Sequence, residues 1–115
     1  MVLFQETNDH PHISQLKCRD KTKTRRDSKR WIMKVGGIYP AHDASKGLYQ
    51  KKEDAELLIR CTDRYEEPLG DMTEAEACLE GQYTLPEFKR LWIGIADMWK
   101  SEKIIKVYEV EPVEG

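Results

Sequence analysis

The strongest periodic pattern of the chain lies toward its C-terminal end. Apolar residues recur there three or four positions apart, which places them on one face of an α-helix. The residues that form this stripe are Leu85, Phe88, Leu91, Trp92, Ile95 and Trp99. Thr84 and Glu87 form a capping box at its start, in which each side chain binds the other residue's backbone amide. We therefore expect an amphipathic helix from about residue 85, with Trp92 and Trp99 in the core.

A second, shorter helix is indicated just before this one. Thr73 and Glu76 have the spacing of another capping box. Gly81 follows about two turns later, and glycine readily takes the left-handed backbone conformation that ends many helices. The sequence therefore predicts a short helix from about residue 74, with Gly81 as its left-handed C-terminal position.

The remaining patterned segments indicate strands. Residues 22–26 alternate threonine with long basic side chains, and residues 104–110 are rich in β-forming residues. Residues 31–35 and 38–39 also favour strand, with a bend at Gly36-Gly37 and an end at Pro40. Residues 47–49 are a further strand candidate, whereas residues 56–64 fit a helix or a strand equally well.

Together these elements predict an α+β fold with about five or six short strands, arranged as a small β-barrel, and about two or three helices. No repeat or Pro/Gly-rich linker divides the 115 residues. We therefore expect one domain over 1–115, with its core at about 12–112. The first ten residues and the C-terminal tail show no such pattern, and we expect them to be loosely held.

Charge is segregated along the chain. Charged residues make up 35% of the sequence, and their formal sum is only −2. Residues 15–34 nevertheless carry a net charge of +7, and residues 53–80 carry −8. A positive block of this size suits binding to phosphate groups. Alternatively, it is a surface tied by ion pairs to the acidic segment.

Several kinds of protein are disfavoured. No apolar run is long enough to cross a bilayer, and the N-terminus lacks the pattern of a signal peptide. The three cysteines are too widely spaced for a disulfide framework, which favours free thiols. His10 and His12 offer too few ligands for zinc, and there is no glycine-rich phosphate loop. We therefore expect a cytoplasmic protein without metal or cofactor, and favour a monomer.

A series of short motifs follows in a recognisable order. They are KTKTRR at 21–26, Trp31, Val35-Gly36, LGDMT at 69–73, Ala77, Glu80-Gly81, Phe88, Trp92 and VYEV at 107–110. This ordered set spans roughly residues 12–112 and resembles the pattern of ASCH-family domains. The chain departs from the pattern at Arg19-Asp20, where the family usually has a small residue or glycine in the turn.

The resemblance implies a PUA-like fold, which is a small β-barrel flanked by helices, with a basic cleft generally thought to bind RNA. One small bacterial branch of the family hydrolyses acetylated cytidine with a lysine as base, a threonine as nucleophile and a glutamate as acid. By motif position, these roles fall on Lys21, Thr24 and Glu80, with Arg26 as an oxyanion or substrate contact. Another branch is reported to cleave single-stranded RNA, through residues that do not map onto this chain.

Amide hydrolysis sets conditions on these residues. A lysine acts as a base only if its pKa, ordinarily about 10.4, falls through burial or neighbouring cations. Side chains three positions apart in a regular strand point to opposite faces. A pair of Lys21 and Thr24 therefore requires Lys21 to lie in a bend before the strand. Glu80 lies near a predicted helix C-terminus, where the helix dipole disfavours a carboxylate by about 0.3–1 kcal/mol, so another constraint is indicated.

RNA or a modified nucleoside is the expected ligand. Candidate contacts are Lys23, Arg25, Arg26, Lys29, Arg30 and Trp31. Trp31, Tyr39 or Tyr49 would stack on a base, although Trp31 also suits packing within the barrel. Three functions stay open: an amidohydrolase acting on acetylcytidine, a non-catalytic RNA-binding module, and a ribonuclease specific for single strands.

Overall fold

The computed structural model describes residues 2–47 and 50–113, which form one five-stranded sheet and three α-helices. In chain order, the main elements are β1 (Val2–Phe4), α1 (His12–Lys17), β2 (Lys23–Arg26), β3 (Ile38–Asp43), β4 (Leu57–Pro68), α2 (Glu74–Gly81), α3 (Leu85–Ala96) and β5 (Ile104–Pro112). Short 3-10 turns lie at Ala44–Lys46, Lys52–Asp54 and Leu69–Asp71. The predicted α+β class is confirmed.

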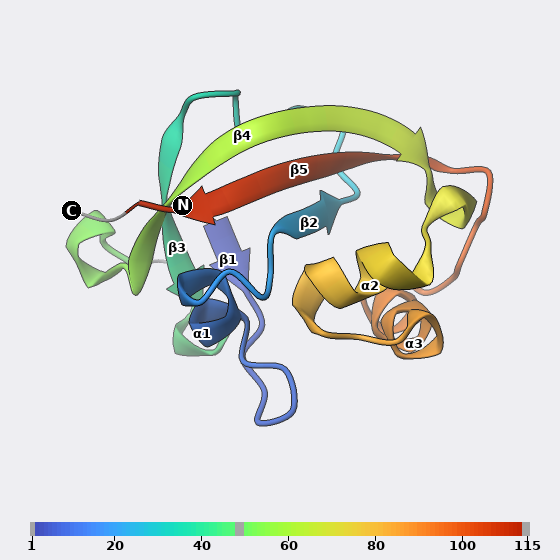
Figure 1. The fold of residues 1–115 in the computed structure, drawn as a ribbon, viewed down its shortest axis with the longest axis horizontal. Coiled ribbons are helices and arrows are strands. Elements are labelled where there is room, and N and C mark those ends of the chain that lie inside the picture. The colour runs from blue at the N-terminus through green and yellow to red at the C-terminus, as the bar shows by residue number, and fades with distance from the viewer. Residues whose placement is uncertain (1, 48–49, 114–115) are drawn as a thin grey trace.

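The sheet runs in the order β1-β3-β4-β5-β2, so β1 and β2 are its two edges. β1 and β3 are parallel, and the other neighbours are antiparallel. The register of β4 against β5 shifts between Cys61 and Asp63. Such a bulge bends a strand and increases its twist. Figure 1 shows β4 and β5 arching together over the rest of the molecule.

The two edges of the sheet approach each other without pairing. Arg26 of β2 donates from Nη2 to the carbonyl oxygen of Leu3 in β1, at 2.8 Å. Over the described ranges, no backbone ladder joins β1 to β2. A complete barrel would need such a ladder. The fold is therefore a barrel-like sheet with an open seam between β1 and β2.

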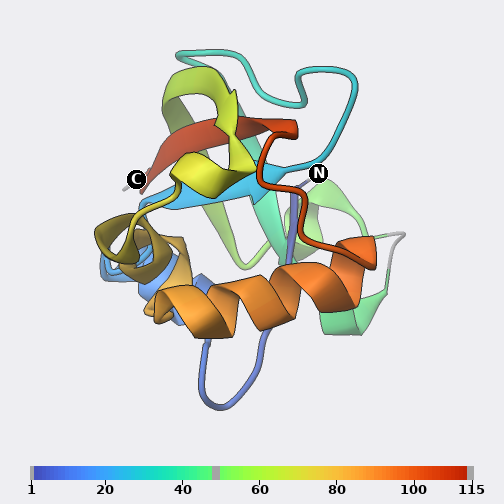
Figure 2. The ribbon, with the colours of Figure 1, turned by 90° about the vertical axis from the view of Figure 1, so that its right-hand side faces the viewer.

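Two hydrophobic clusters form the core. The first joins β1 and α1 to the sheet and comprises Val2, Phe4, Ile13, Leu16, Met33, Ala41, Ile59, Cys61, Tyr108 and Val110. The second joins α2 and α3 to the segments around them and to β5, and comprises Leu69, Met72, Ala77, Tyr83, Phe88, Trp92 and Ile105. In Figures 1 and 2, α2 and α3 lie below one end of the arch of β4 and β5. The helices thus cover the region beside β2.

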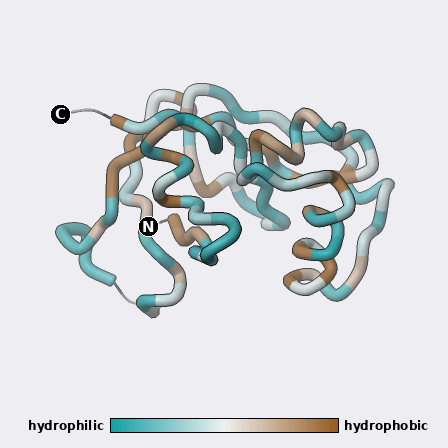
Figure 3. The backbone as a smooth tube through the Cα atoms, turned by 60° about the horizontal axis from the view of Figure 1, so that its bottom comes forward, coloured by the Kyte–Doolittle hydropathy of each residue, from teal (hydrophilic) through white to brown (hydrophobic). Residues whose placement is uncertain are grey.

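Both capping boxes predicted from the sequence are present. Thr73 accepts from the amide of Glu76 at 3.2 Å, and Thr84 accepts from that of Glu87 at 3.2 Å, with the reciprocal bonds in place. Hydrophobic and hydrophilic residues are interspersed along α3 (Figure 3). Trp92 is buried, as predicted, whereas Trp99 lies beyond the end of α3 and is only partly buried against the second core cluster.

The end of α2 differs from the prediction. The left-handed position belongs to Gln82, with φ of 64°, whereas Gly81 has φ of 157°. Glycine is instead needed at 81 for space, because a Cβ there would lie 2.7 Å from both His12 Nε2 and Tyr83 Cε2. Gly81 therefore allows α1 and the start of α3 to approach the end of α2.

The N-terminal segment is also better ordered than the sequence indicated. The expectation of loosely held residues is wrong for β1, because Phe4 is buried in the first core cluster. The helix α1 was not anticipated. Its two apolar residues, Ile13 and Leu16, pack in the first core cluster and stabilise the helix, since an isolated helix of this length is not stable in water.

The expectation of strand at residues 31–35 is wrong, because these residues form a loop between β2 and β3. Pro40 lies within β3 rather than ending it. β1 pairs with β3 only from Ala41 onward, so Pro40 has a strand neighbour on one side alone, where a missing amide is tolerated. The segment 56–64, which fitted a helix or a strand, is a strand from Leu57 onward, as part of β4. Of the candidate strand at 47–49, residues 48–49 lie outside the described residues.

The cysteines Cys18, Cys61 and Cys78 are free thiols, as their spacing predicted. Cys61 is buried in β4, and the other two are exposed. Within residues 2–47 and 50–113, the helices are too short or too polar to span a bilayer.

Candidate functional site

A cavity of about 430 Å³ lies at the open seam of the sheet. Its lining comes from both edge strands, the turn before β2, the end of α2 and one face of α3. The lining residues are Leu3, Phe4, Gln5, His12, Lys21, Thr24, Arg25, Arg26, Asp27, Ser28, Ile32, Ala44, Glu80, Phe88, Leu91, Trp92, Ile95 and Ala96. A volume of this size and a largely apolar wall with a few polar groups are typical of a site for a small organic ligand.

Lys21 reaches this cavity because it precedes the regular strand. β2 begins at Lys23, and the amide of Lys21 donates to the carbonyl of Gln15 at 3.1 Å. Arg19 takes the left-handed conformation, with φ of 68°, at the position where a glycine would be expected. The turn therefore places Lys21 outside the alternation of β2, so that it and Thr24 line the same cavity.

The amine of Lys21 is almost completely shielded from water. The residue is 2% exposed, and its Nζ donates to the carbonyl of Lys23 at 2.8 Å and to the carbonyl of Glu80. Burial lowers the pKa of Lys21 to about 8, with Arg26 and Arg25 adding to this effect and Glu80 opposing it. A substantial neutral fraction near physiological pH follows from this value.

Thr24 and Arg26 share the cavity-facing side of β2. Thr24 is 2% exposed, and among the described residues its hydroxyl has no hydrogen-bond partner. Arg26 uses Nη2 to bind Leu3, while Nε and Nη1 have no partner in the same part of the chain. The ring of Phe4 lies 5.2 Å from the Arg26 guanidinium. The polar side of the cavity thus presents a hydroxyl and guanidinium donors.

Glu80, which is 3% exposed, is held in one orientation by Arg25. Its Oε2 accepts from Arg25 Nη1 at 2.8 Å, and its Oε1 accepts from the Arg25 amide at 3.2 Å. Arg25 also binds Glu67 and, at 2.9 Å, Glu76. The Arg25 side chain is therefore a buried link between carboxylates. No group of acidic, histidine or cysteine side chains suited to a metal occurs in the described ranges.

Two solved structures have a similar fold. Protein EF3133 of Enterococcus faecalis V583, of family DUF984, superimposes with a TM-score of 0.60 at 16% identity, over 88% of this chain and 66% of that chain. An ASCH domain from Lactobacillus crispatus JV V101 superimposes with a TM-score of 0.60 at 10% identity, over 87% of this chain and 69% of that one. The chain has the ASCH fold.

This ASCH-fold chain spans about two thirds of the length of both solved structures. Neither the comparison with protein-family models nor the search of curated proteins gives a match. The likeness therefore establishes the fold, and the function has to be argued from the cavity itself.

The basic segment of this chain, residues 15–34, is only partly an exposed cationic surface. Lys21 and Arg25 are buried. Lys23 donates to the hydroxyl of Tyr65 at 2.8 Å and lies 3.4 Å from Glu76; although burial lowers its pKa, these partners raise it overall. Ion pairing to the acidic segment is thus found for Lys23 and Arg25. The exposed cations of this segment that lie near the cavity are on the loop after β2, at Lys29 and Arg30.

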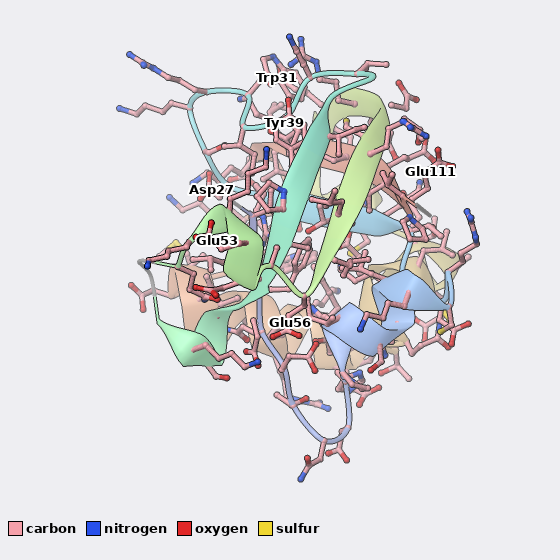
Figure 4. All side chains as sticks on the ribbon, turned by 90° about the vertical axis from the view of Figure 1, so that its left-hand side faces the viewer. Asp27, Trp31, Tyr39, Glu53, Glu56 and Glu111 are labelled. Carbon is pink, nitrogen blue, oxygen red and sulfur yellow. The ribbon has the colours of Figure 1, made fainter. Side chains whose placement is uncertain are left out.

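Trp31 lies on the same loop (Figure 4). It is 36% exposed and packs edge-on against Tyr108, with 5.8 Å between ring centroids. Arg64 and Lys106 lie over its ring at 4.6 and 5.2 Å. Trp31 is therefore partly packed on the barrel, and a stacking base would compete with these cations. Tyr49 lies outside the described residues.

Sequence reasoning missed part of the cavity. Leu3 and Phe4 line it although the N-terminus carried no periodic pattern, and His12 lines it from the unanticipated α1. The apolar run at residues 2–4 was the available signal. The apolar stripe on α3 predicts core packing alone, whereas Leu91 and Ile95 also form a cavity wall.

Proposed function

We propose that this chain is an ASCH-type amidohydrolase that removes an acyl group from the exocyclic amine of a cytidine-type nucleoside. The observation that carries the proposal is that Lys21, Thr24, Arg26 and Glu80 all line one cavity of small-molecule size. These side chains come from the turn before β2, from β2 itself and from the end of α2. In this proposal Lys21 is the base, Thr24 the nucleophile, Glu80 the acid and Arg26 the oxyanion contact.

The hydrogen bonds of Lys21 suit a base. A neutral amine has two N–H groups and one lone pair, and the carbonyls of Lys23 and Glu80 provide acceptors for both N–H groups. The lone pair then remains available for the proton of Thr24. With a pKa of about 8, roughly one tenth of the molecules carry the neutral amine at pH 7. That fraction is sufficient for general-base catalysis.

The proposed reaction has two steps. Thr24 Oγ1 bonds to the acyl carbon while its proton passes to Lys21, and the charge that forms on the acyl oxygen is stabilised by the free donors of Arg26. The carbon–nitrogen bond then breaks, and the exocyclic amine leaves with a proton passed from Lys21 through Glu80. In the second step, water attacks the acyl-threonine with Lys21 as base, which releases the carboxylic acid and restores the hydroxyl.

Burial of the cationic segment favours a small ligand over an extended nucleic acid. Lys21 and Arg25 are enclosed, so they do not face the phosphates of a bound strand. A non-catalytic RNA-binding module is the second candidate, and one observation favours it. The loop after β2 carries exposed Lys29 and Arg30 beside Ser28 and Ile32, which line the cavity.

The test is release of cytidine from N4-acetylcytidine. We expect Lys21→Ala and Thr24→Val to lower kcat by roughly 10²–10⁴-fold, the usual range for loss of a general base or its partner. Lys23→Ala is the matched control. Lys23 is the neighbour of Thr24 on β2, but it does not line the cavity. A wild-type protein without turnover, or turnover retained in both variants, would show that this is not the reaction. Steeply salt-dependent binding of short RNA without turnover would support the second candidate.

A further inference from the structure

His12 is a buried polar group of the cavity that the proposed reaction does not use. It is 7% exposed and lines the cavity from the start of α1. The ring of Phe4 lies at 6.5 Å and that of Tyr83 at 5.7 Å, both at steep angles to the imidazole. Gly81 makes this position accessible, since any side chain there would collide with His12 Nε2. Residues of three separate segments, Phe4, Gly81 and Tyr83, thus surround this imidazole.

The hydrogen bond to Tyr83 bears on which nitrogen of the His12 ring carries the proton. His12 Nε2 is 2.8 Å from the Tyr83 hydroxyl. Burial, with Glu80 and Glu87 adding to it, raises the pKa of Tyr83 to about 12, so the phenol keeps its proton. Within the described ranges, the hydroxyl has no other hydrogen-bond partner. A protonated phenol that donates to Nε2 leaves the proton of the neutral imidazole on Nδ1, and this is the tautomer on which the inference below is built.

The other nitrogen of His12, Nδ1, is not completely enclosed, and His12 lines the cavity. In the described part of the chain, Nδ1 has no partner, and it is not among the completely enclosed polar atoms that lack one, which are Gln15 Oε1, Arg25 Nε and His42 Nε2. Burial, then the charges of Lys21, Arg26 and His10, lower the pKa of the imidazole to about 3, so it stays neutral. With its proton on Nδ1, the neutral imidazole offers an N–H donor to the largely apolar cavity that His12 lines.

We propose that His12 is a specificity-determining residue, whose Nδ1–H donates to a ring carbonyl oxygen of the ligand, such as O2 of a pyrimidine. This inference rests on the proposed function for the class of ligand, and extends it by assigning the group that reads the base. Arg26, a cation, suits the charge that develops on the acyl oxygen. Neutral His12 suits a carbonyl that stays uncharged, and as a donor it rejects a ring that presents an N–H or amino group there.

The test compares binding of cytidine with that of 2-thiocytidine, whose sulfur is a weaker acceptor, by calorimetric titration. We expect the wild type to bind cytidine roughly tenfold more tightly, the value of one neutral hydrogen bond. In His12→Gln the amide occupies the place of Nε2, beside Tyr83, and the preference should disappear. In His12→Asn the amide occupies the place of Nδ1, and the preference should persist. An equal preference in the wild type and in His12→Gln would overturn the inference.

A measurement on the wild type avoids dependence on the folding of variants. The ¹⁵N spectrum of the His12 ring should show a protonated Nδ1 and an unprotonated Nε2 at pH 7, with Nδ1 shifting when cytidine is added. The opposite tautomer, or no binding of cytidine, would overturn the assignment. Turnover of N4-acetylcytidine is measured in parallel. A His12-dependent preference without turnover would refute the proposed hydrolysis alone, and turnover without that preference would refute the role of His12 alone.

Discussion

Replacing the buried lysine of the cavity by methionine should make the protein more stable and inactive. The fall of the Lys21 pKa from 10.5 to about 8 measures the cost of burying its ammonium. Each tenfold change in proton affinity is worth about 1.4 kcal/mol, so the cost is about 3 kcal/mol below pH 8. Lys21→Met removes that cost but loses two hydrogen bonds to the carbonyls of Lys23 and Glu80, each worth about 1 kcal/mol. The variant should thus gain about 1 kcal/mol at pH 7, which raises Tm by roughly 4 °C.

The sign of this difference should reverse with pH. Below pH 8, Lys21 is protonated in both the folded and the unfolded chain, and the full cost is present. Between pH 8 and 10.5 the unfolded chain still binds a proton that the folded chain has released, so the wild type becomes more stable as the pH rises. Above this window, the wild type should exceed Lys21→Met by about 2 kcal/mol.

The assay is urea denaturation of both proteins at several pH values from 7 to about 10.5, with the difference in unfolding free energy as the readout. Lys23→Met is the matched control, two residues away on β2. Because the folded state raises the pKa of Lys23, its favourable contribution is lost as the pH rises, so its pH dependence has the opposite sign. A Lys21→Met variant that is less stable than the wild type at pH 7, with a difference independent of pH, would refute the reasoning.

Three further predictions concern the same region. The rate of acyl hydrolysis should rise about tenfold per pH unit below the Lys21 pKa of about 8 and level off above it, so a flat pH–rate profile would exclude Lys21 as base. Gly81→Ala should destabilise the fold by about 1–3 kcal/mol, because its Cβ would overlap His12. Gly94→Ala, in open space on α3, should instead stabilise by about 0.5–1 kcal/mol, and thermal melts of the two variants test this contrast. Arg25→Met should cost about 3–5 kcal/mol in urea denaturation, since it leaves the buried carboxylate of Glu80 without its cation, and a loss below about 1 kcal/mol would contradict this.

The local elements were predictable because their signals are local. The capping boxes at Thr73 and Thr84 locate two helix starts, and both require only residues three positions apart. The condition on Lys21, that it precede the regular strand, was likewise stated from the side-chain alternation of β2 and is met by the turn at Arg19. The actual conformation of that turn was not predictable, since a left-handed arginine is an uncommon choice.

The tertiary structure decided which charges are free. The +7 net charge of residues 15–34 indicated a cationic face, but Arg25 lies buried among carboxylates brought from β4 and α2. Such pairing joins residues more than 40 positions apart, and neither composition nor periodicity records it. The apparent phosphate-binding block is therefore in part the interior of an ion-pair network.

The sequence by itself determined the α+β class and the starts of α2 and α3, because propensity and capping act over a few residues. Its ordered motifs also carry the family resemblance that makes Lys21, Thr24 and Glu80 candidate site residues. Only the tertiary structure decided that β1 and β2 face each other across an open seam, and that α3 forms a wall of the resulting cavity. The same packing buried Lys21 and placed His12 opposite Tyr83. The proton affinity of a side chain depends on the groups packed around it, and chain folding alone brings those groups together.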